Sequence, residues 1–465
     1  MKTILISLPF GMSARNILRS AAYEILKKEA RVVIVSPLSS NAAFREEFAS
    51  PQTVFASLSP ARSFLRKLLE RVFVPGQLWR FTADHPTGTL TLLRRKLLRS
   101  KPVAYALYAL LGKTLGDRPF LFKLYRGSLR NSAAGRILDE NKVDLVFTTH
   151  GYVETDVELA AEAQARGIPV VNMIHSWDNV SSKSGLTQIT NMMLGRLLLV
   201  DLYQHILVWN DVLKEELREM YGVADEKITV VGIPQFDSYS TLKNRVDRES
   251  FLKSFNANPN KKLILYCAGS PVLVHDQTAI VKNLVEAVRG GKLSKPAQLL
   301  IRSHPGAMQN WRNDFSGPDV FFQTPTNADK AMAVDGWDKR VETDSEIAKS
   351  IANCDVLVHC ISTVAIEGAI FDRPTLGVGY DGDASHSDAV RRAYEETTHY
   401  SKLMSTGGSR VAVSAEDMIK QIDAYLVSPE RDKEGREKTR SQQCFQVDGK
   451  SGERIGRFLV ELLRK

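Results

Sequence analysis

The chain alternates short apolar runs with longer amphipathic segments, and this alternation restricts its fold more than any other feature. In the first half, the apolar runs lie at residues 2–8, 31–36, 143–147, 168–174, 205–209 and 228–231. In the second half, they lie at residues 263–267, 298–303, 320–322, 356–359 and 375–378. Such runs are typical of strands buried on both faces of a parallel sheet, and the segments between them can form crossover helices. The sequence therefore predicts an α/β fold with parallel sheets.

The two series of runs indicate two domains. The chain has 465 residues, which is more than a single hydrophobic core usually serves. Residues 236–260 are polar and end in Asn258-Pro259-Asn260, as expected of a linker. We therefore expect an N-terminal domain over residues 1–235 and a C-terminal domain over residues 236–440, with the ligand between them. Residues 441–465 end in an amphipathic helix, which we expect to pack back on the first domain.

Composition excludes several classes of protein. Apolar residues make up 43% of the chain and charged residues 25%, which argues against disorder or a coiled coil. The apolar run at the N-terminus is too short for a signal peptide, and no apolar run of the chain is long enough to span a membrane. We expect a cytoplasmic protein, either soluble or peripheral on the inner face of the plasma membrane. The cysteines lack metal-binding spacing and are expected to be core residues in a reducing compartment; they are Cys267, Cys354, Cys360 and Cys444.

Basic residues are concentrated in one segment. Residues 51–136 contain 16 Lys and Arg against 3 Asp and Glu, whereas the whole chain has a net charge of +9. Apolar residues alternate with these cations at helical spacing, so we expect a basic helical insertion that contacts an anionic membrane surface or a polyanionic partner. The alternative is a set of helices packed on their own domain with a solvated basic face. No zinc-finger or RNP-type motif is present, so we expect no nucleic acid partner.

Loops after three predicted strands of the second half carry groups that suit an anionic ligand. In an open parallel sheet, ligands bind beyond the carboxyl ends of the strands. Gly269 allows close approach of the backbone, and a loop before a helix is favourable for phosphate. Pro305 keeps His304 out of the α region, where the imidazole can donate to a phosphate oxygen. The candidate donor-binding residues are Gly269, Ser270, Arg302, His304, Pro305, Ser362 and Thr363.

Glu367 completes this set. It follows Thr363 by four residues, so both side chains lie on one face of the helix that Ser362 and Thr363 open. A carboxylate in this position is suited to accept hydrogen bonds from ribose hydroxyls. The alternative for Glu367 is a favourable interaction with the helix dipole. For Gly269 and His304, the alternatives are an ordinary strand-to-helix turn and a surface turn.

The second half resembles a known family of transferases. Arg302-Ser303-His304-Pro305, Ser362-Thr363 and Glu367-Gly368-Ala369 resemble the donor half of GT-B glycosyltransferases. The resemblance is closest to the group of CDP-glycerol glycerophosphotransferases, capsule-polysaccharide transferases and bacterial sialyltransferase-like enzymes, and it covers residues 263–379 best. It implies a GT-B fold of two Rossmann-like domains facing a cleft. It also implies that the His-Pro and Ser-Thr motifs hold the donor phosphates and that the helix Glu holds the ribose.

The first half supplies candidates for a catalytic base. The segment from His175 to Asn179 is similar to one in bacterial surface-carbohydrate transferases. An inverting transfer needs a base that deprotonates the acceptor hydroxyl. Our first candidate is Asp178 and our second is His175; in the glycerophosphotransferases a His-Gly pair occupies this loop, so the choice stays open. The acidic and imidazole groups at or just after predicted strand ends are His150, Glu154, Asp156, His175 and Asp178.

Glu154 and Asp156 have an alternative role as acids at a helix start. Gly11, Arg15 and Lys183 are candidates for binding the acceptor or a phosphate. No cofactor is expected, because a nucleotide-sugar is a substrate. A metal is not expected either, since the donor site already offers cationic and hydroxyl groups to a departing phosphate.

Three functional interpretations follow. The first is a glycosyltransferase that moves a sugar from a nucleotide-activated donor to a glycan or lipid-linked glycan, with polyol-phosphate transfer from a CDP-activated donor as a variant. The second is a nucleotide-sugar 2-epimerase, which needs no acceptor and has no use for the basic segment. The third is a non-catalytic protein that binds an acidic polymer, which the joint presence of the donor motifs disfavours. The sequence favours the first.

Overall fold

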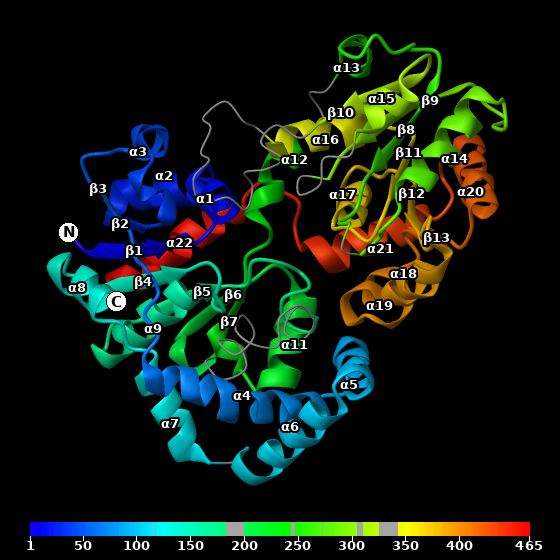
Figure 1. The fold of residues 1–465 in the computed structure, drawn as a ribbon. Coiled ribbons are helices and arrows are strands. Elements are labelled where there is room, and N and C mark those ends of the chain that lie inside the picture. The colour runs from blue at the N-terminus through cyan, green and yellow to red at the C-terminus, as the bar shows by residue number, and fades with distance from the viewer. Residues whose placement is uncertain (117, 183–199, 243–246, 272, 305–309, 325–342) are drawn as a thin grey trace. The chain divides into compact units, whose positions relative to one another are not determined.

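The computed structural model describes residues 1–116, 118–182, 200–242, 247–271, 273–304, 310–324 and 343–465 (Figure 1). These residues form two compact units. The first contains the described residues up to Pro234 together with Lys450–Lys465. The second contains the described residues from Gln235 to Gly449.

In its described residues, the first unit contains a seven-stranded parallel sheet in the order β3-β2-β1-β4-β5-β6-β7. Its central strands are buried on both faces, as their Val-, Ile- and Leu-rich sequences predict. The strands are β1 (Thr3–Ser7), β2 (Arg31–Val35), β3 (Thr53–Ala56), β4 (Leu145–Thr148), β5 (Val170–Met173), β6 (His205–Val208) and β7 (Ile228–Val230). The crossover and flanking helices are α1 (Gly11–Leu18), α2 (Ala21–Glu29), α3 (Ala42–Phe48), α8 (Ser132–Glu140), α9 (Glu154–Ala165) and α11 (Asp211–Tyr221).

The last helix of the chain, α22 (Ser451–Arg464), packs along α2 of the first unit (Figure 1). A Cβ on Gly456 would lie 3.0 Å from the Cα of Ala22, so glycine permits the close approach of the two helices. At the far end, Arg464 pairs with Glu29 at 2.8 Å. The apolar face of α22 therefore completes the core of the first unit.

Four helices form the basic insertion: α4 (Phe64–Asp84), α5 (Gly88–Ser100), α6 (Pro102–Leu115) and α7 (Pro119–Ser128). α4 and α6 approach closely, since a Cβ on Gly76 would lie 2.8 Å from the backbone nitrogen of Gly112. A buried ion pair holds α4 to the sheet domain, because Arg66 donates to Glu158 of α9 at 2.6 Å. Within α4, Arg66 also donates to Glu70 at 2.9 Å. The insertion is thus a packed part of the first unit.

In its described residues, the second unit contains a six-stranded parallel sheet in the order β10-β9-β8-β11-β12-β13. The strands are β8 (Lys262–Cys267), β9 (Ala297–Arg302), β10 (Val320–Gln323), β11 (Val356–His359), β12 (Thr375–Val378) and β13 (Arg410–Ala412). The helices are α12 (Asp237–Leu242), α13 (Arg248–Lys253), α14 (Thr278–Arg289), α15 (Trp311–Phe315), α16 (Thr343–Asn353), α17 (Val364–Ile370), α18 (Ala384–Glu396), α19 (Thr398–Met404), α20 (Ala415–Val427) and α21 (Lys433–Cys444).

Both sheets have the doubly wound Rossmann order, in which the first strand lies at the centre and the order reverses beside it. The reversal lies between β1 and β4 in the first unit and between β8 and β11 in the second. Ligands of such sheets bind outside the carboxyl ends of the strands at this switch point. The predicted α/β class with two Rossmann-like units is confirmed.

Three expected boundaries differ from the structure. Residues 53–56, expected within the helical insertion, form the edge strand β3, because Thr53, Val54 and Phe55 are strand formers paired with β2. The polar segment 236–260, expected as a linker, contains α12 and α13. Residue 440, expected as the end of the second domain, lies inside α21.

Candidate active site

The loops after β8 and β11 touch at the switch point of the second sheet. A Cβ on Gly269 would lie 2.3 Å from the carbonyl oxygen of Cys360, so only glycine fits there. The amide nitrogen and the carbonyl oxygen of Gly269 are each 2.9 Å from the side chain of Gln277. The turn that carries Gly269 and Ser270 is therefore held against the turn that precedes Ser362.

Ser362 and Thr363 lie half-buried between the end of β11 and the start of α17. The Ser362 hydroxyl accepts a hydrogen bond from the amide of Val364 at 3.3 Å. The Thr363 side chain makes no capping hydrogen bond to α17. A hydroxyl that accepts from the backbone can still donate its proton, so both side chains are suited to bind an anion.

Glu367 lies on α17 and is 4% exposed. The Tyr239 hydroxyl donates to its Oε2 at 2.7 Å, and the Tyr239 ring packs between Phe236 and Phe371. No sequence pattern predicts this tyrosine, because it lies more than a hundred residues away on α12. Tyr239 fixes the orientation of the carboxylate that we expected to bind ribose.

Arg302, which we expected to bind the donor, is buried at the end of β9. Its side chain is 5% exposed, and Nη1 donates to the Gln323 Oε1 at 2.7 Å. The same Gln323 oxygen accepts the hydroxyl of Ser350 at 2.9 Å. The guanidinium is thus bonded directly to β10, and the Gln323 oxygen links it to Ser350 of α16.

His304 follows β9 by two residues and is half-buried. Burial lowers the pKa of its imidazole below the ordinary value, so the ring is neutral at pH 7 and offers one N–H donor. β9 and β11 flank β8, so they are separated by about 10 Å. His304, Gly269 and Ser362 therefore lie along one sheet edge within reach of a single extended ligand. Pro305 lies outside the described residues.

Two imidazole rings meet at the corresponding edge of the first sheet. His150 follows β4 by two residues, and His175 follows the neighbouring strand β5 by two residues. Their ring centroids are 4.1 Å apart, with an angle of 34° between the planes. The hydroxyl of Ser13, on α1, lies 3.0 Å from Nδ1 of His150. Loops from three elements thus converge on this imidazole pair.

Asp156 supports the loop of His150 from inside. It is fully buried in the first turn of α9, where its Oδ1 accepts the Ser7 hydroxyl at 2.5 Å. Its Oδ2 accepts the backbone amide of His150 at 2.6 Å. Burial raises the pKa of this carboxyl to about 7, because the charged form loses its hydration.

The other predicted residues of the first unit occupy different surroundings. Asp178 is half-buried in the turn after His175, where its carbonyl oxygen accepts the amide of Ser182 at 3.2 Å. Glu154, at the start of α9, forms ion pairs with Arg62 and Arg66 of the insertion segment. Glu154 is therefore tied to structural arginines.

Gly11 begins α1 just beyond β1, and Arg15 is half-buried one turn later on the same helix. They share the switch-point edge with the imidazole pair, because β1 and β4 are neighbours. Lys183 lies outside the described residues.

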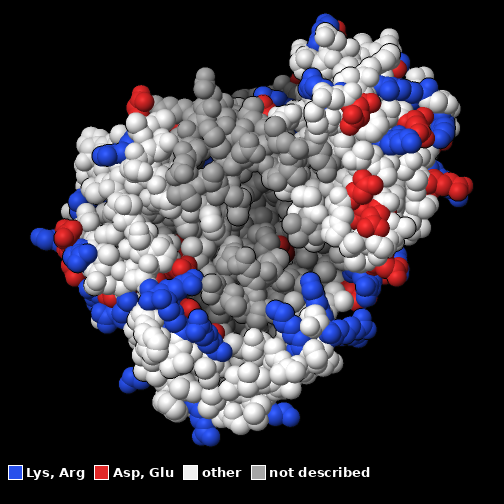
Figure 2. Space-filling view, viewed as in Figure 1, with Lys and Arg blue, Asp and Glu red and all other residues white. Residues whose placement is uncertain are grey.

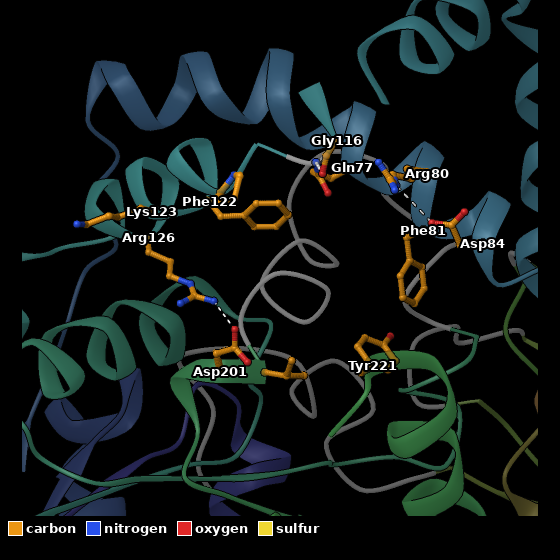
Figure 3. Close-up of a pocket in the computed structure, with 12 residues that line it drawn as sticks. Gln77, Arg80, Phe81, Asp84, Gly116, Phe122, Lys123, Arg126, Asp201 and Tyr221 are labelled. Carbon is orange, nitrogen blue, oxygen red and sulfur yellow. Dashed lines mark hydrogen bonds and ion pairs between the residues drawn. The ribbon is translucent and has the colours of Figure 1, made fainter. Parts of the chain in front are cut away.

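A cavity of about 960 Å³ opens in the first unit between the insertion and the sheet domain (Figure 3). Figure 3 shows the ring of Phe122 pointing into it from α7, with Phe81 and Tyr221 on the opposite side. Arg126 pairs with Asp201 across its edge at 2.5 Å. Lys123 also lines the cavity, so aromatic and cationic groups share its wall.

The two carboxylates of the Asp381-Gly382-Asp383 segment have structural roles. Asp381 accepts the backbone amides of His275 at 2.7 Å and Asp276 at 2.8 Å, and Asp383 caps α18. In the described part of the chain, no three His, Cys, Asp or Glu side chains are grouped so as to hold a metal ion. Among the described helices, none has the length and apolarity needed to cross a membrane.

Comparison with known families agrees with this arrangement. The family model described as CDP-glycerol:poly(glycerophosphate) glycerophosphotransferase matches residues 164–461, which is more than half of the chain. The chain belongs to this family. A second family model, described as glycosyltransferase family 4, matches residues 92–232 of the same chain. No curated protein matches it.

Solved structures share the fold of this glycerophosphotransferase-family protein. The wall teichoic acid polymerase TagF has 10% identity and a TM-score of 0.53, covering 100% of this chain and 89% of TagF. A UDP-GlcNAc 2-epimerase of Methanocaldococcus jannaschii, in complex with UDP-GlcNAc and UDP, has 14% identity and a TM-score of 0.52. The match covers 99% of this chain and 100% of the epimerase. A glycosyltransferase of Rickettsia africae has 13% identity and a TM-score of 0.51, and the match covers 100% of this chain and 99% of the glycosyltransferase. Together with the family models, these matches confirm the prediction of a GT-B transferase of the glycosyltransferase type.

Proposed function

We propose that the protein transfers a sugar from a nucleotide-activated donor to a lipid-linked or surface-polysaccharide acceptor of the cell envelope, such as a capsule precursor. The observation that carries this proposal is the edge of the second sheet. There a neutral imidazole, a glycine turn and two hydroxyls lie at the ends of adjacent strands within a transferase fold. This combination of neutral donors suits a diphosphate.

In this proposal, the donor occupies the edge of the second sheet. His304, Ser362 and Thr363 donate to the phosphates, the turn of Gly269 and Ser270 approaches them, and Glu367 accepts from the ribose hydroxyls. The complex of the similar epimerase with UDP supports a nucleotide diphosphate at a fold of this kind. The phosphates meet N–H and O–H donors, so we propose that turnover needs neither a metal nor a cofactor. Addition of EDTA is then expected to leave the rate unchanged.

The first unit binds the acceptor and supplies the base. The acceptor hydroxyl gives its proton to the base as its oxygen attacks the anomeric carbon, and the bond to the departing nucleotide phosphate breaks with inversion. Asp178 and His175 are the two candidates for the base. Asp178 is half-buried, and His175 stacks on the supported ring of His150. Glu154 is the weaker candidate, since its carboxylate pairs with arginines.

The insertion is proposed to dock on the anionic inner face of the plasma membrane. Lysine and arginine side chains gather over these helices in Figure 2. Most of the exposed large apolar side chains of the described residues are on the same helices. On α6, Val103, Leu107 and Leu110 form an outward stripe at helical spacing, and α7 adds Phe120 and Leu124. An exposed apolar stripe among cations fits the interface of an anionic bilayer.

This membrane contact also suggests a place for the acceptor. The cavity of Figure 3 lies under α4 and α7 of the docking insertion and offers both aromatic and cationic walls. Sugar rings stack on aromatic faces, and phosphates pair with Arg and Lys. We propose that the glycan or phosphate part of a lipid-linked acceptor enters here, with Phe122 and Lys123 among its contacts.

Two alternatives are favoured by specific findings. The family model favours transfer of glycerophosphate or another polyol phosphate from a CDP-activated donor. The second alternative is isomerisation of a nucleotide-sugar without an acceptor, the reaction for which the epimerases of the same fold are named.

A panel of donors distinguishes these functions. The purified protein is first screened by thermal shift with CMP, CDP, UDP and GDP, and nucleotide release is then followed with the matching activated sugars and CDP-glycerol. The proposal predicts release that requires an acceptor and is strongly reduced in His304→Ala and Asp178→Ala. Full turnover in both variants would remove the assigned roles. Conversion of a nucleotide-sugar alone to an epimer would identify an isomerase.

A further inference from the structure

The turn that carries Ser362 has a strained backbone. Ile361 adopts a φ of 38°, in the left-handed region. A β-branched residue is a true outlier there, because its Cβ crowds the backbone. Such conformations persist only where surrounding contacts hold them, and they concentrate at functional sites.

Two buried tyrosines make those contacts. The Tyr394 hydroxyl accepts the amide of Ile361 at 2.8 Å and donates to the carbonyl of His359 at 3.4 Å. The Tyr400 hydroxyl donates to the carbonyl of Ser362 at 2.8 Å. Tyr394 and Tyr400 are 1% and 2% exposed, and their rings meet edge to face at 5.0 Å. Backbone groups on both sides of the strained residue are thus bound by one pair of tyrosines.

The space for this pair is built into the sheet. A Cβ on Gly377 of β12 would lie 2.8 Å from the Tyr394 ring, so a glycine makes room for it. Burial raises the pKa of Tyr394 well above its ordinary value, so the hydroxyl stays protonated and can both accept and donate. The tyrosines come from α18 and α19, which are otherwise remote in sequence from the turn.

We infer that Tyr394 and Tyr400 are positioning residues that hold the Ile361 turn in its strained form, so that the Ser362 and Thr363 hydroxyls face the donor phosphates. This inference rests on the proposed function, because it assigns a task to the same donor edge. The tyrosine hydroxyls bind the backbone of the turn, so the serine and threonine hydroxyls can donate to the phosphates of the nucleotide donor. Relaxation of Ile361 would rotate the peptide before Ser362 and misdirect its side chain.

Phenylalanine substitutions test the inference, since Tyr394→Phe and Tyr400→Phe remove only the hydroxyls. Each substitution is expected to weaken binding of CDP or UDP, measured by isothermal titration, by about five-fold, because the turn loses the hydrogen bonds of that hydroxyl. Tyr425→Phe is the matched control: it is a buried tyrosine of the same unit whose hydroxyl donates to Asp432 at 2.7 Å. This control is expected to lower the melting temperature comparably while leaving nucleotide affinity unchanged.

A second variant shows whether strain is the cause. Asparagine tolerates positive φ far better than isoleucine, so Ile361→Asn should hold the turn with less help. In that background, Tyr400→Phe is expected to cost clearly less than five-fold in affinity. Equal affinity in all three tyrosine variants, or an undiminished loss in the Ile361→Asn background, would overturn the inference. If the unaltered protein binds none of the four nucleotides, the proposed function itself fails.

Discussion

Removal of the outward apolar stripe on α6 gives the sharpest test of membrane docking. Val103 is 83% exposed and Leu107 is 51% exposed, so both can leave water when the helix meets a bilayer. Full burial of a Val or Leu side chain is worth about 1.5–3 kcal/mol. Scaled by exposure, the two side chains contribute about 2.5 kcal/mol together. The double variant Val103→Ser with Leu107→Ser should therefore lower vesicle binding about 60-fold.

The assay is co-sedimentation with vesicles of phosphatidylcholine alone or mixed with phosphatidylglycerol. Unaltered protein should bind the anionic vesicles, with an electrostatic contribution of about 1 kcal/mol per contacting cation that weakens as salt is added. Because both side chains are exposed, the double variant should unfold at the same temperature as the parent.

Val427→Ser is the control for this assay, since Val427 is 53% exposed on α20 of the second unit. It should leave vesicle binding unchanged. The docking argument is refuted if the α6 double variant binds as well as the control, or if neutral and anionic vesicles bind the protein equally.

Three further predictions concern buried groups. Asp156 has a pKa of about 7 in the folded protein against 3.8 ordinarily, so its contribution favours folding at low pH and falls, by about 4 kcal/mol in total, as pH rises from about 4 to 7. Urea unfolding near pH 5 and pH 8 should show a smaller fall in stability for Asp156→Asn than for the parent, and an equal fall would contradict the assignment. Gly269→Ala should cost about 1–3 kcal/mol and weaken nucleotide binding, because the new methyl meets the Cys360 backbone. The paired control is Gly127→Ala, whose methyl would meet open space on α7. If calorimetry shows the same loss of stability in both alanine variants, the steric argument is wrong. Glu367→Gln should weaken nucleoside diphosphate binding about ten-fold but leave inorganic pyrophosphate unaffected, because only the nucleotide has a ribose; parallel titrations with the two ligands decide this.

The strands and the sheet edges could be predicted from the sequence because each depends on local pattern. Apolar runs such as residues 263–267 become strands wherever helices can cover both faces. Gly269 and Ser362 follow such runs, so parallel pairing alone brings them to one edge. His150 and His175 meet for the same reason, since consecutive parallel strands are usually neighbours.

The roles of Arg302 and Glu154 could not be predicted, because they depend on partners far away in the sequence. Arg302 lies opposite Gln323 only in the register that β9 and β10 adopt, and no local pattern fixes that register. Glu154 meets Arg66 only because the insertion folds back on α9. In both cases the partner comes from a distant part of the chain: a neutral amide that accepts from Arg302, and arginines that pair with Glu154.

The two units share one strand order but place different chemistry at their switch points. The first edge has two imidazole rings whose centroids are 4.1 Å apart, and imidazole is a common proton acceptor in proteins. The second edge has a neutral imidazole, hydroxyls and a glycine turn, which can stabilise negative charge without changing protonation. A group transfer from a nucleotide needs both tasks, and they conflict within one site, because a cation or oxyanion ligand placed beside a base shifts its pKa. The proposed division of these tasks between two Rossmann-like sheets keeps the candidate bases in one unit and the candidate phosphate ligands in the other.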